Sequence, residues 1–292
     1  MDERIRLAIQ KSGRLTESCK KIFEKSGLSF NADDRQLFYT IPEMPIDLLF
    51  VRDDDIPSLV SKGTCDFGIV GLDTFEETKF EENSNFDADI FARLGIAKCR
   101  LAIAVPAAMK FDSLQNLNGL KIATSFPYSV KNFLNQNNIN AEIVHMSGSV
   151  EISPSLKLSD IIADLVSSGT TLLQNNLKEI ATILESEAVL INNKRISDSK
   201  RAIADRFMTR VRSALSVAHK KYIVLNAPKN KVDEIAKLLP GSESPTILPL
   251  INQDMVSIHA ICTETRFWEV MERLKKAGAS SIAVLAIEKM LD

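Results

Sequence analysis

The chain has 292 residues, of which 45% are hydrophobic and 25% are charged, the profile of a globular protein long enough for two domains. Its net charge of −2 gives no sign of a nucleic-acid or membrane partner, and no apolar run approaches the ~20 residues of a membrane span. The start MDERIRLAIQKSG has no apolar signal core, and the four cysteines and three histidines are scattered without metal-ligand spacing, so we expect a cytoplasmic protein with reduced thiols.

The first part of the chain alternates strand-like and helix-like segments. RIRLAI (4–9) predicts a strand, which is followed by a loop and by a helix that ends at Gly27. IDLLFV (46–51) and DFGIVG (66–71) predict two further strands, and between them Asp55 can cap a short helix. This rhythm indicates a parallel or mixed α/β sheet.

A second block of the same kind begins with RLAIAVP (100–106), and the chain returns to the first block within ILESEAVLI (183–191). We therefore expect two α/β lobes, residues 1–95 with about 183–219 and residues 96–182, with a cleft between them. The other predicted elements of the second block are strands over 119–126, 141–146 and 161–166 and a helix over 127–138.

The last third of the chain predicts a separate domain. Residues 199–221 form one amphipathic pattern, a connecting helix with Ala202, Ile203, Phe207, Val211, Leu215 and Ala218 on its apolar face. Beyond it the order is strand, helix, strand, strand, helix, strand within about 70 residues. That order is ferredoxin-like, so residues 220–292 are predicted to fold as a small C-terminal domain.

The stretch ADLVSSGTT (163–171) joins an apolar strand to a helix through a turn rich in hydroxyls. Backbone N–H groups and the helix dipole at such a turn favour an anion such as phosphate. Gly169 would let the ligand approach the backbone, and Asp164 needs donors that sugar hydroxyls could supply. A ribose 5-phosphate meets both demands, but a capped helix with Asp164 satisfied by backbone explains the same residues equally well. The hydroxyl donors are Ser167, Ser168, Thr170 and Thr171.

Charged residues also follow the predicted strands of the first block. Because such a sheet gathers the carboxyl ends of its parallel strands at one edge, these residues and Asp164 are expected in one cleft. Taken singly, each is a weak signal, and Lys11 and Arg14 are better explained as solvated charges on a loop. Asp53 to Asp55, which look like a Mg²⁺ site, are better explained as helix-cap and first-turn charges. The residues at strand ends are Lys11, Arg14, Arg52 and Asp73.

Several strings together resemble the long form of ATP phosphoribosyltransferase, the first enzyme of histidine biosynthesis, essentially from end to end. The resemblance implies a two-lobed catalytic region similar to type II periplasmic binding proteins and a ferredoxin-like regulatory domain. It also implies histidine as feedback inhibitor and homodimers that interconvert with homohexamers without a separate regulatory subunit. The strings are IQKSGRL, MPIDLLFVRDDDIPSLV, GIVGLDTFEE, NGLKIATSFP, GSVEISP, DLVSSGTTLLQNNLKEI, SPTILPL and ETRFWEVMERLKKAGASSIAVLAIEKM.

The reaction implied by the resemblance joins ATP to phosphoribosyl pyrophosphate, with Mg²⁺ held through the pyrophosphate rather than by protein ligands. The family's catalytic positions fall on Arg14, Arg52 and Asp164. Its substrate-binding positions fall on Lys11, Asp73, Glu151, Ser167, Ser168, Gly169, Thr170 and Thr171.

Histidine binding is implied for Asn226, Ser242, Thr246, Ser280 and Ser281, between the sheets of adjacent regulatory domains. Asn226 stands where some members carry Asp, which leaves open how the ligand's ammonium or imidazole is held. From their residue types alone, turn and cap roles are the preferred interpretation of these small polar residues.

Two other functions fit parts of the sequence. A two-lobed α/β chain can be a solute-binding module without catalysis, and the C-terminal domain by itself resembles amino-acid sensors. The absence of a signal core weighs against a periplasmic binding module, and the intact stretch from Asp164 to Thr171 weighs against a catalytically dead sensor.

Overall fold

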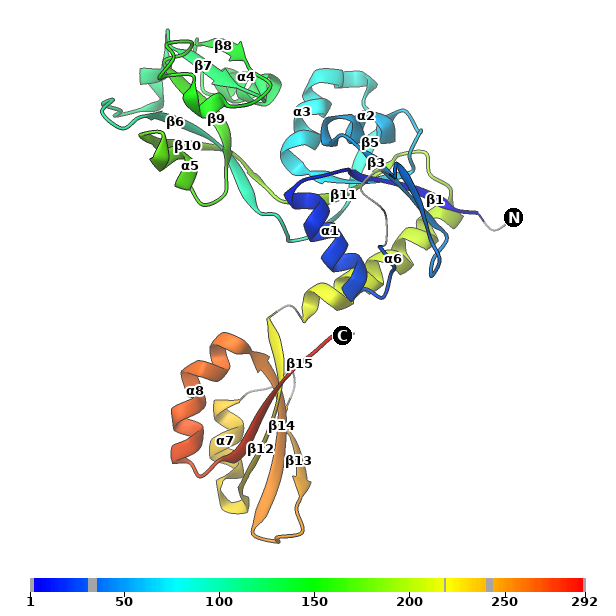
Figure 1. Ribbon diagram of the computed structural model, residues 1–292. Coiled ribbons are helices and arrows are strands. Elements are labelled where there is room, and N and C mark those ends of the chain that lie inside the picture. Colours follow the sequence, from blue (N-terminus) through cyan, green and yellow to red (C-terminus); the bar gives the residue numbers. More distant parts are fainter. Residues whose placement is uncertain (1–2, 31–35, 218, 240–243, 291–292) are drawn as a thin grey trace. The chain divides into compact units, whose positions relative to one another are not determined.

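The computed structural model describes residues 3–30, 36–217, 219–239 and 244–290, which form three β-sheets with their helices (Figure 1). The chain divides into two compact units, Met1–Lys21 with Ser29–Ala204 and Ile22–Leu28 with Asp205–Asp292. Two sheets belong to the first unit and one to the second. The lobe boundaries at 95 and 182 and the domain start at 220 stay predictions.

The first sheet has the strand order β2-β3-β1-β4-β11-β5, with β1, β3 and β4 parallel and the other pairings antiparallel. Helices α2 and α3 share a core cluster with Ala8, Val70 and Ile191 from three of these strands. The bounds are β1 Ile5–Gln10, α1 Arg14–Lys25, β2 Phe38–Ile41, β3 Ile46–Val51, α2 Ile56–Ser61, β4 Phe67–Gly71, α3 Leu72–Glu82, β5 Ala88–Arg93 and β11 Ala188–Asn193.

The second sheet has the order β10-β6-β9-β7-β8, in which β7 runs parallel to β8 and β9. β6 lies antiparallel between β9 and β10 and is buried from Leu101 to Val105. The bounds are β6 Cys99–Pro106, β7 Lys121–Thr124, α4 Pro127–Gln136, β8 Glu142–His145, β9 Ile161–Val166, α5 Thr170–Gln174 and β10 Leu177–Ser186.

The chain passes between these two sheets twice, from β5 to β6 and from β10 to β11. At the second passage, Ser186 ends a strand of the second sheet and Ala188 begins a strand of the first. Short 3-10 turns lie at Asp53–Asp55, Asn83–Asn85, Leu114–Leu117, Val150–Ile152 and Lys229–Lys231.

Two local predictions are wrong. Asp55 makes no side-chain cap hydrogen bond to α2, because the chain enters that helix directly from the 3-10 turn that Asp55 ends. The connecting helix is α6, Asp198–Ser216, which stops short of residue 221 because β12 already begins at Lys220. Ile203, Phe207 and Val211 are buried as expected, whereas Ala202 is exposed.

The third sheet confirms the ferredoxin-like order, with strands β13-β14-β12-β15 all antiparallel. Alternate residues of β12, Ile223, Leu225 and Ala227, pack with helices α7 and α8 on one face. Part of the other face stays exposed, including Tyr222 and Leu285. The bounds are β12 Lys220–Pro228, α7 Val232–Leu238, β13 Thr246–Pro249, β14 Met255–Thr263, α8 Glu264–Lys276 and β15 Ser280–Ala286.

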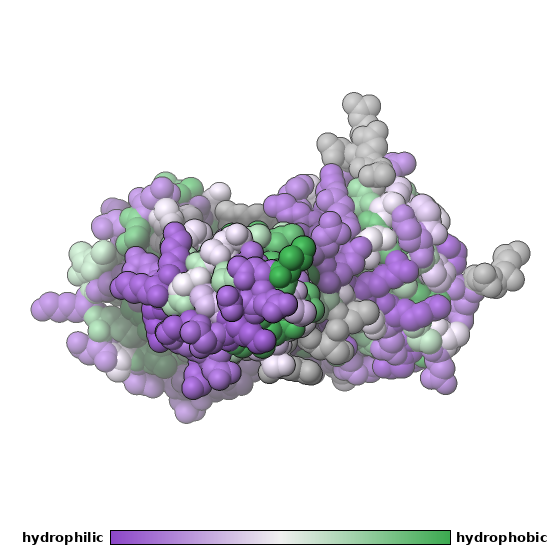
Figure 2. Space-filling view, turned by 90° about the horizontal axis from the view of Figure 1, so that it is seen from below, coloured by the Kyte–Doolittle hydropathy of each residue, from purple (hydrophilic) through white to green (hydrophobic). Residues whose placement is uncertain are grey.

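Exposed hydrophobic residues are a minority of the surface. Figure 2 shows mainly hydrophilic residues on the face that it presents, with hydrophobic residues gathered in smaller patches. No helix among the described residues is long and apolar enough to cross a membrane.

Candidate functional site

The carboxyl ends of β1, β3 and β4 meet at one edge of the first sheet, because these strands are parallel neighbours. The backbone N–H of Lys11 donates to the carbonyl of Val51 at 2.8 Å, which holds the loop after β1 beside the end of β3. Lys11 and Arg52 are both exposed there. Arg14 is the first residue of α1, and its side chain lies outside the described part of the chain.

Among the predicted site residues, Asp73 is held in place by burial and by two hydrogen bonds. It lies in the first turn of α3, where its side chain is only 5% exposed. The Ser186 hydroxyl donates to its Oδ1, and the Asp73 backbone N–H donates to Ser186 Oγ at 3.1 Å. A Cβ on Gly71 would lie 2.5 Å from the same Oδ1, so the carboxylate occupies the space that this glycine leaves free.

A pocket of about 420 Å³ lies where Asp73 and the end of β9 meet. Asp73 of the first sheet's helix and Ser167 of the loop after β9 both line it, so the two sheets contribute predicted site residues to one pocket. Its other lining residues include Gln10, Leu15, Ser18, Asp53, Thr74, Lys98, Cys99 and Leu165.

Cys99 is the thiol in this pocket. Burial raises its pKa above the ordinary value, and the charge of Asp73 raises it further, while a hydrogen bond with Ser186 opposes the shift. The thiol therefore stays protonated at neutral pH, and Cys99 is not an activated nucleophile.

The loop between β9 and α5 has an open outer surface. Gly169 adopts φ +79°, a left-handed conformation that glycine reaches without strain, and no atom lies within 4 Å of where its Cβ would be. The hydroxyls of Ser168 and Thr170 lie 2.9 Å apart, and both residues are exposed. A ligand could therefore reach both the backbone and the hydroxyls of this loop.

Asp164 lies within β9, two residues before its end. Burial raises the pKa of its carboxyl, the hydrogen bond from the Leu165 backbone N–H at 2.7 Å lowers it, and the nearby charge of Glu151 raises it again. Glu151 lies in the 3-10 turn between strands β8 and β9 of the second sheet, and the fold brings it close to Asp164. The pair would gain from hydroxyl donors or a cation placed between them.

The described residues include no group of three or more His, Cys, Asp or Glu side chains arranged to hold a metal ion. Mg²⁺ commonly binds through one or two carboxylates together with phosphate oxygens of a substrate. Asp53 and Asp73 both line the pocket and could supply such carboxylates. These residues fit a magnesium ion that arrives with a pyrophosphate.

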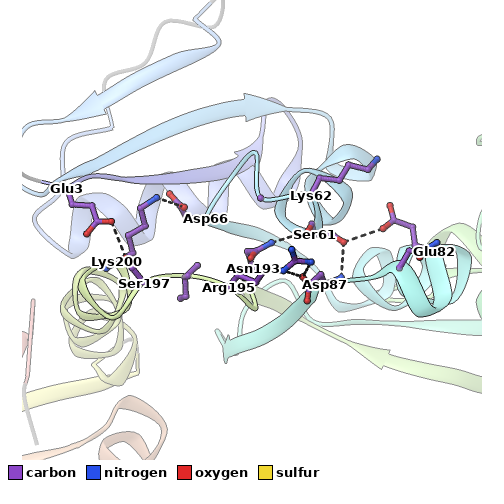
Figure 3. A pocket seen from close by; sticks show the side chains of 13 residues that line it. Glu3, Ser61, Lys62, Asp66, Glu82, Asp87, Asn193, Arg195, Ser197 and Lys200 are labelled. Carbon is purple, nitrogen blue, oxygen red and sulfur yellow. Dashed lines mark hydrogen bonds and ion pairs between the residues drawn. The ribbon is translucent and has the colours of Figure 1, made fainter.

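A larger pocket of about 830 Å³ lies at the other edge of the first sheet, near the residues that precede β1 and β4 (Figure 3). Its charges are largely paired with one another: Lys200 binds Asp66 at 2.7 Å, and Arg195 binds Asp87. Because these groups satisfy each other, the pocket presents few free donors or acceptors to a ligand.

Sequence reasoning missed Ser186, Lys98 and Leu165. Ser186 lies in a segment interpreted only as the return of the chain to the first block, and its partner Asp73 is 113 residues away. Lys98 lies between the end of β5 and the start of β6, where the chain crosses to the second sheet. The sequence signal that could have identified Lys98 and Ser186 was their position where the chain crosses between the two predicted lobes, since residues at such crossings border the cleft between the lobes.

In the third sheet, Asn226 of β12 lies between Ser257 of β14 and Ser280 of β15. Ser281 adopts φ +49° where β15 shifts register, and Thr246 of β13 lies opposite His259. Ser242 falls outside the described residues. The structure thus brings Asn226 and Ser280 together and places Thr246 at the far edge of the sheet.

The profile of the ATP phosphoribosyltransferase family matches residues 52–213, and that of the HisG C-terminal domain matches residues 218–289. An ATP phosphoribosyltransferase of Bacteroides thetaiotaomicron is 44% identical over 287 residues, which cover 98% of this chain and 99% of that protein.

Two solved structures share the fold. A chain of the ATP phosphoribosyl transferase (HisG:HisZ) complex from Thermotoga maritima matches with a TM-score of 0.61 and 24% identity, over 73% of this chain and 98% of that one. The periplasmic aliphatic sulphonate binding protein SsuA from Escherichia coli matches with a TM-score of 0.50 and 14% identity, over 74% and 70%. The predicted likeness of the two lobes to periplasmic binding proteins is confirmed.

Proposed function

Because the chain belongs to the ATP phosphoribosyltransferase family and carries both its catalytic part and its C-terminal domain, we propose that it transfers the 5-phosphoribosyl group of phosphoribosyl pyrophosphate to N1 of ATP. The products are N1-(5-phosphoribosyl)-ATP and pyrophosphate. The chain is an enzyme of pentosyl transfer in histidine biosynthesis. We expect it to act in the cytoplasm.

The observation that carries this proposal is the shared pocket of Asp73 and Ser167. A reaction that joins two large phosphorylated substrates needs groups on both sides of the reacting carbon. The exposed hydroxyls and backbone after β9 suit the 5-phosphate, and Asp164 suits the ribose hydroxyls. Lys11 and Arg52, exposed at the ends of β1 and β3, suit the phosphates of ATP and the leaving pyrophosphate.

The reaction needs alignment and charge neutralisation more than proton transfer. Adenine N1 is a weak nucleophile, so the bond from the ribose C1 to pyrophosphate breaks largely before the new bond forms, and the leaving group takes most of the negative charge. Cationic side chains aimed at that charge lower the barrier. Mg²⁺ bound through the pyrophosphate oxygens would neutralise further charge.

The test is to mix the protein with ATP, phosphoribosyl pyrophosphate and Mg²⁺ and to follow the ultraviolet absorbance of N1-substituted adenine. Arg52→Ala should lower turnover by roughly 100-fold, because a cation aimed at the leaving group is lost. Lys62→Ala is the matched control, since Lys62 is an exposed cation that lines the larger pocket at the opposite edge of the same sheet. If the wild type forms no product while both substrates bind, a solute-binding module is the better description.

Histidine inhibition is the regulatory half of the proposal. In one copy of the sheet, β13 and β15 are separated by β14 and β12, so Thr246 and Ser281 lie about 14 Å apart at the usual strand spacing. A single amino acid is too small to bridge that distance. Binding between the sheets of adjacent copies would bring both sets of polar groups to it, which supports a homohexamer as the inhibited form.

Initial rates with millimolar histidine test this regulation in the full chain. Asn226→Ala and Thr246→Val should each raise the inhibitory histidine concentration by about tenfold and leave the uninhibited rate unchanged, because both lie outside the catalytic part. Lys229→Ala, on the exposed turn after β12, is the control. Sedimentation with and without histidine should show a shift from dimer to hexamer, and unchanged inhibition in both variants would remove these residues from the histidine site.

A further inference from the structure

Helix α3 carries two acidic residues that act in different places. Asp73 and Glu77 are four residues apart and therefore lie on the same face of the helix, one turn from each other. Asp73 lines the proposed substrate pocket. Glu77 turns toward α4, the helix between strands β7 and β8 of the second sheet.

Glu77 binds the amino end of α4 with both carboxylate oxygens. Oε1 accepts from the backbone N–H of Tyr128 and Oε2 accepts from that of Ser129, each at 2.8 Å. Pro127, the first residue of α4, has no N–H, and Phe126 before it supplies no side-chain cap. The free N–H groups at this end of the helix are therefore capped from the other sheet, and the carboxylate also meets the positive end of the helix dipole.

The capped helix is linked to the proposed phosphate loop through short, ordered contacts. The hydroxyl of Thr124, the last residue of β7, accepts from the Phe126 backbone N–H at 3.0 Å and so fixes α4 to β7. β7 pairs in parallel with β9, with Thr124 opposite Ala163, the residue before Asp164. Helix α3 thus carries Asp73 itself. Through Glu77 it also contacts α4, which is fixed to β7, the strand that pairs with β9 next to Asp164.

We propose that Glu77 is a positioning residue that clasps the two lobes and sets the separation of Asp73 from the loop of Ser167–Thr171 during phosphoribosyl transfer. The inference rests on the proposed function. Within residues 36–217, all of which the structure describes, the backbone connects the two sheets only where β5 passes to β6 and β10 passes to β11. The Glu77 clasp adds a contact away from those two crossings, and without it the crossings would act as a hinge.

Amide hydrogen exchange of the full chain tests whether the clasp exists in solution. In Glu77→Ala, the amides of Tyr128 and Ser129 should exchange at least about tenfold faster than in the wild type, because both lose their acceptor. Glu76→Ala is the matched control, since Glu76 lies on the same helix and pairs with Lys79 at 3.1 Å instead. Equal exchange of these amides in wild type and Glu77→Ala would overturn the clasp.

Steady-state kinetics test whether the clasp positions the site. We expect KM for phosphoribosyl pyrophosphate to rise by about tenfold in Glu77→Ala, with a smaller change in kcat, because binding must then close the lobes as well. Glu77→Gln keeps one acceptor oxygen and should fall between alanine and wild type. A cap that only stabilises the fold would lower the melting temperature and leave KM unchanged, and that result would overturn the positioning role.

The two proposals fail in different ways. If the wild type forms no phosphoribosyl-ATP, the proposed function is wrong, and the exchange of the Tyr128 and Ser129 amides still reports on the clasp. If the wild type is active and KM is unaffected in Glu77→Ala, the function stands and the positioning role of Glu77 is wrong.

Discussion

Ser186 and Asp73 exchange two hydrogen bonds across 113 residues of chain: the Asp73 backbone N–H donates to Ser186 Oγ, and the Ser186 hydroxyl donates to the Asp73 carboxylate. Both side chains are buried. Ser186 is the last residue of β10, directly before the chain crosses from the second sheet to the first. The crossing therefore fixes the carboxylate that lines the proposed substrate pocket.

Ser186→Ala should weaken both stability and catalysis. It leaves a buried carboxylate without its hydroxyl donor, a loss worth about 1–3 kcal/mol of unfolding free energy. The freed Asp73 side chain should also lower kcat/KM. Urea unfolding and steady-state kinetics measure the two effects. Ser216→Ala is the control, because the Ser216 hydroxyl donates to backbone carbonyls rather than to a carboxylate and Ser216 does not line the pocket. Unchanged kinetics in Ser186→Ala would limit Ser186 to a structural role.

Gly71→Ala tests whether the position of Asp73 depends on the missing side chain. The new Cβ would lie 2.5 Å from Asp73 Oδ1, although the backbone at Gly71 is unstrained for alanine at φ −66°. Relieving the overlap requires Asp73 to move, which should cost about 1–3 kcal/mol in unfolding free energy. In a double-mutant cycle with Asp73→Ala, the cost of Gly71→Ala should largely disappear. An additive cycle would contradict this steric coupling.

The strands that sequence patterns predicted are those with continuous apolar runs. Leu7 to Ile9 and Ile161 to Ala163 are fully buried, and such runs leave a strong signal. β2 and β5 were missed because both lie at the edges of the first sheet, where the exposed residues of β2 and the interspersed charges of β5 break the apolar run. An edge strand is defined by its neighbour more than by its own residues.

The candidate site was predictable only where one stretch carries the whole signal. The hydroxyl-rich turn after β9 could be interpreted locally, because strand, glycine and helix start follow each other within ten residues. The roles of Ser186 and Glu77 could not be predicted from their local sequence, since each residue acts through a partner more than fifty residues away. In sequence Glu77 is one of several acids on a helix, and only the position of α4 gives it a distinct role.

Gly169 offers a way to separate folding from phosphate binding. Its left-handed φ of +79° should make Gly169→Ala cost about 1–2 kcal/mol of unfolding free energy, and Gly169→Asn should cost less because Asn tolerates this region better. No protein atom lies within 4 Å of the position of a new Cβ, so any further effect must come from the ligand. We expect KM for phosphoribosyl pyrophosphate to rise in both variants, as titration of substrate would show. An unchanged KM would place the phosphate elsewhere.

We predict that the Asp164 carboxylate lowers the stability of the folded protein while it supports activity. The dependence of the unfolding free energy on pH tests the effect on stability. Burial and the charge of Glu151 raise the pKa of its carboxyl in the folded protein, so between the ordinary value of about 3.9 and the raised value the folded state binds more protons than the unfolded state. Its contribution to stability is therefore present below that range and is lost as pH rises through it. Asp164→Asn keeps an acceptor for the Leu165 N–H and should be more stable than wild type at pH 7, with a gap that narrows toward pH 4.

The same variant should lose about 100-fold in turnover, because an amide replaces the carboxylate that we propose holds the ribose. Urea unfolding between pH 3.5 and 7.5 measures the stability difference. Glu151→Gln should lower the pKa of Asp164 by removing the neighbouring charge, and so should move the acid limb of the kcat/KM profile to lower pH. If Asp164→Asn proves less stable than wild type at pH 7, the carboxylate has a stabilising partner in the folded protein, and its buried charge does not destabilise the fold as we predict.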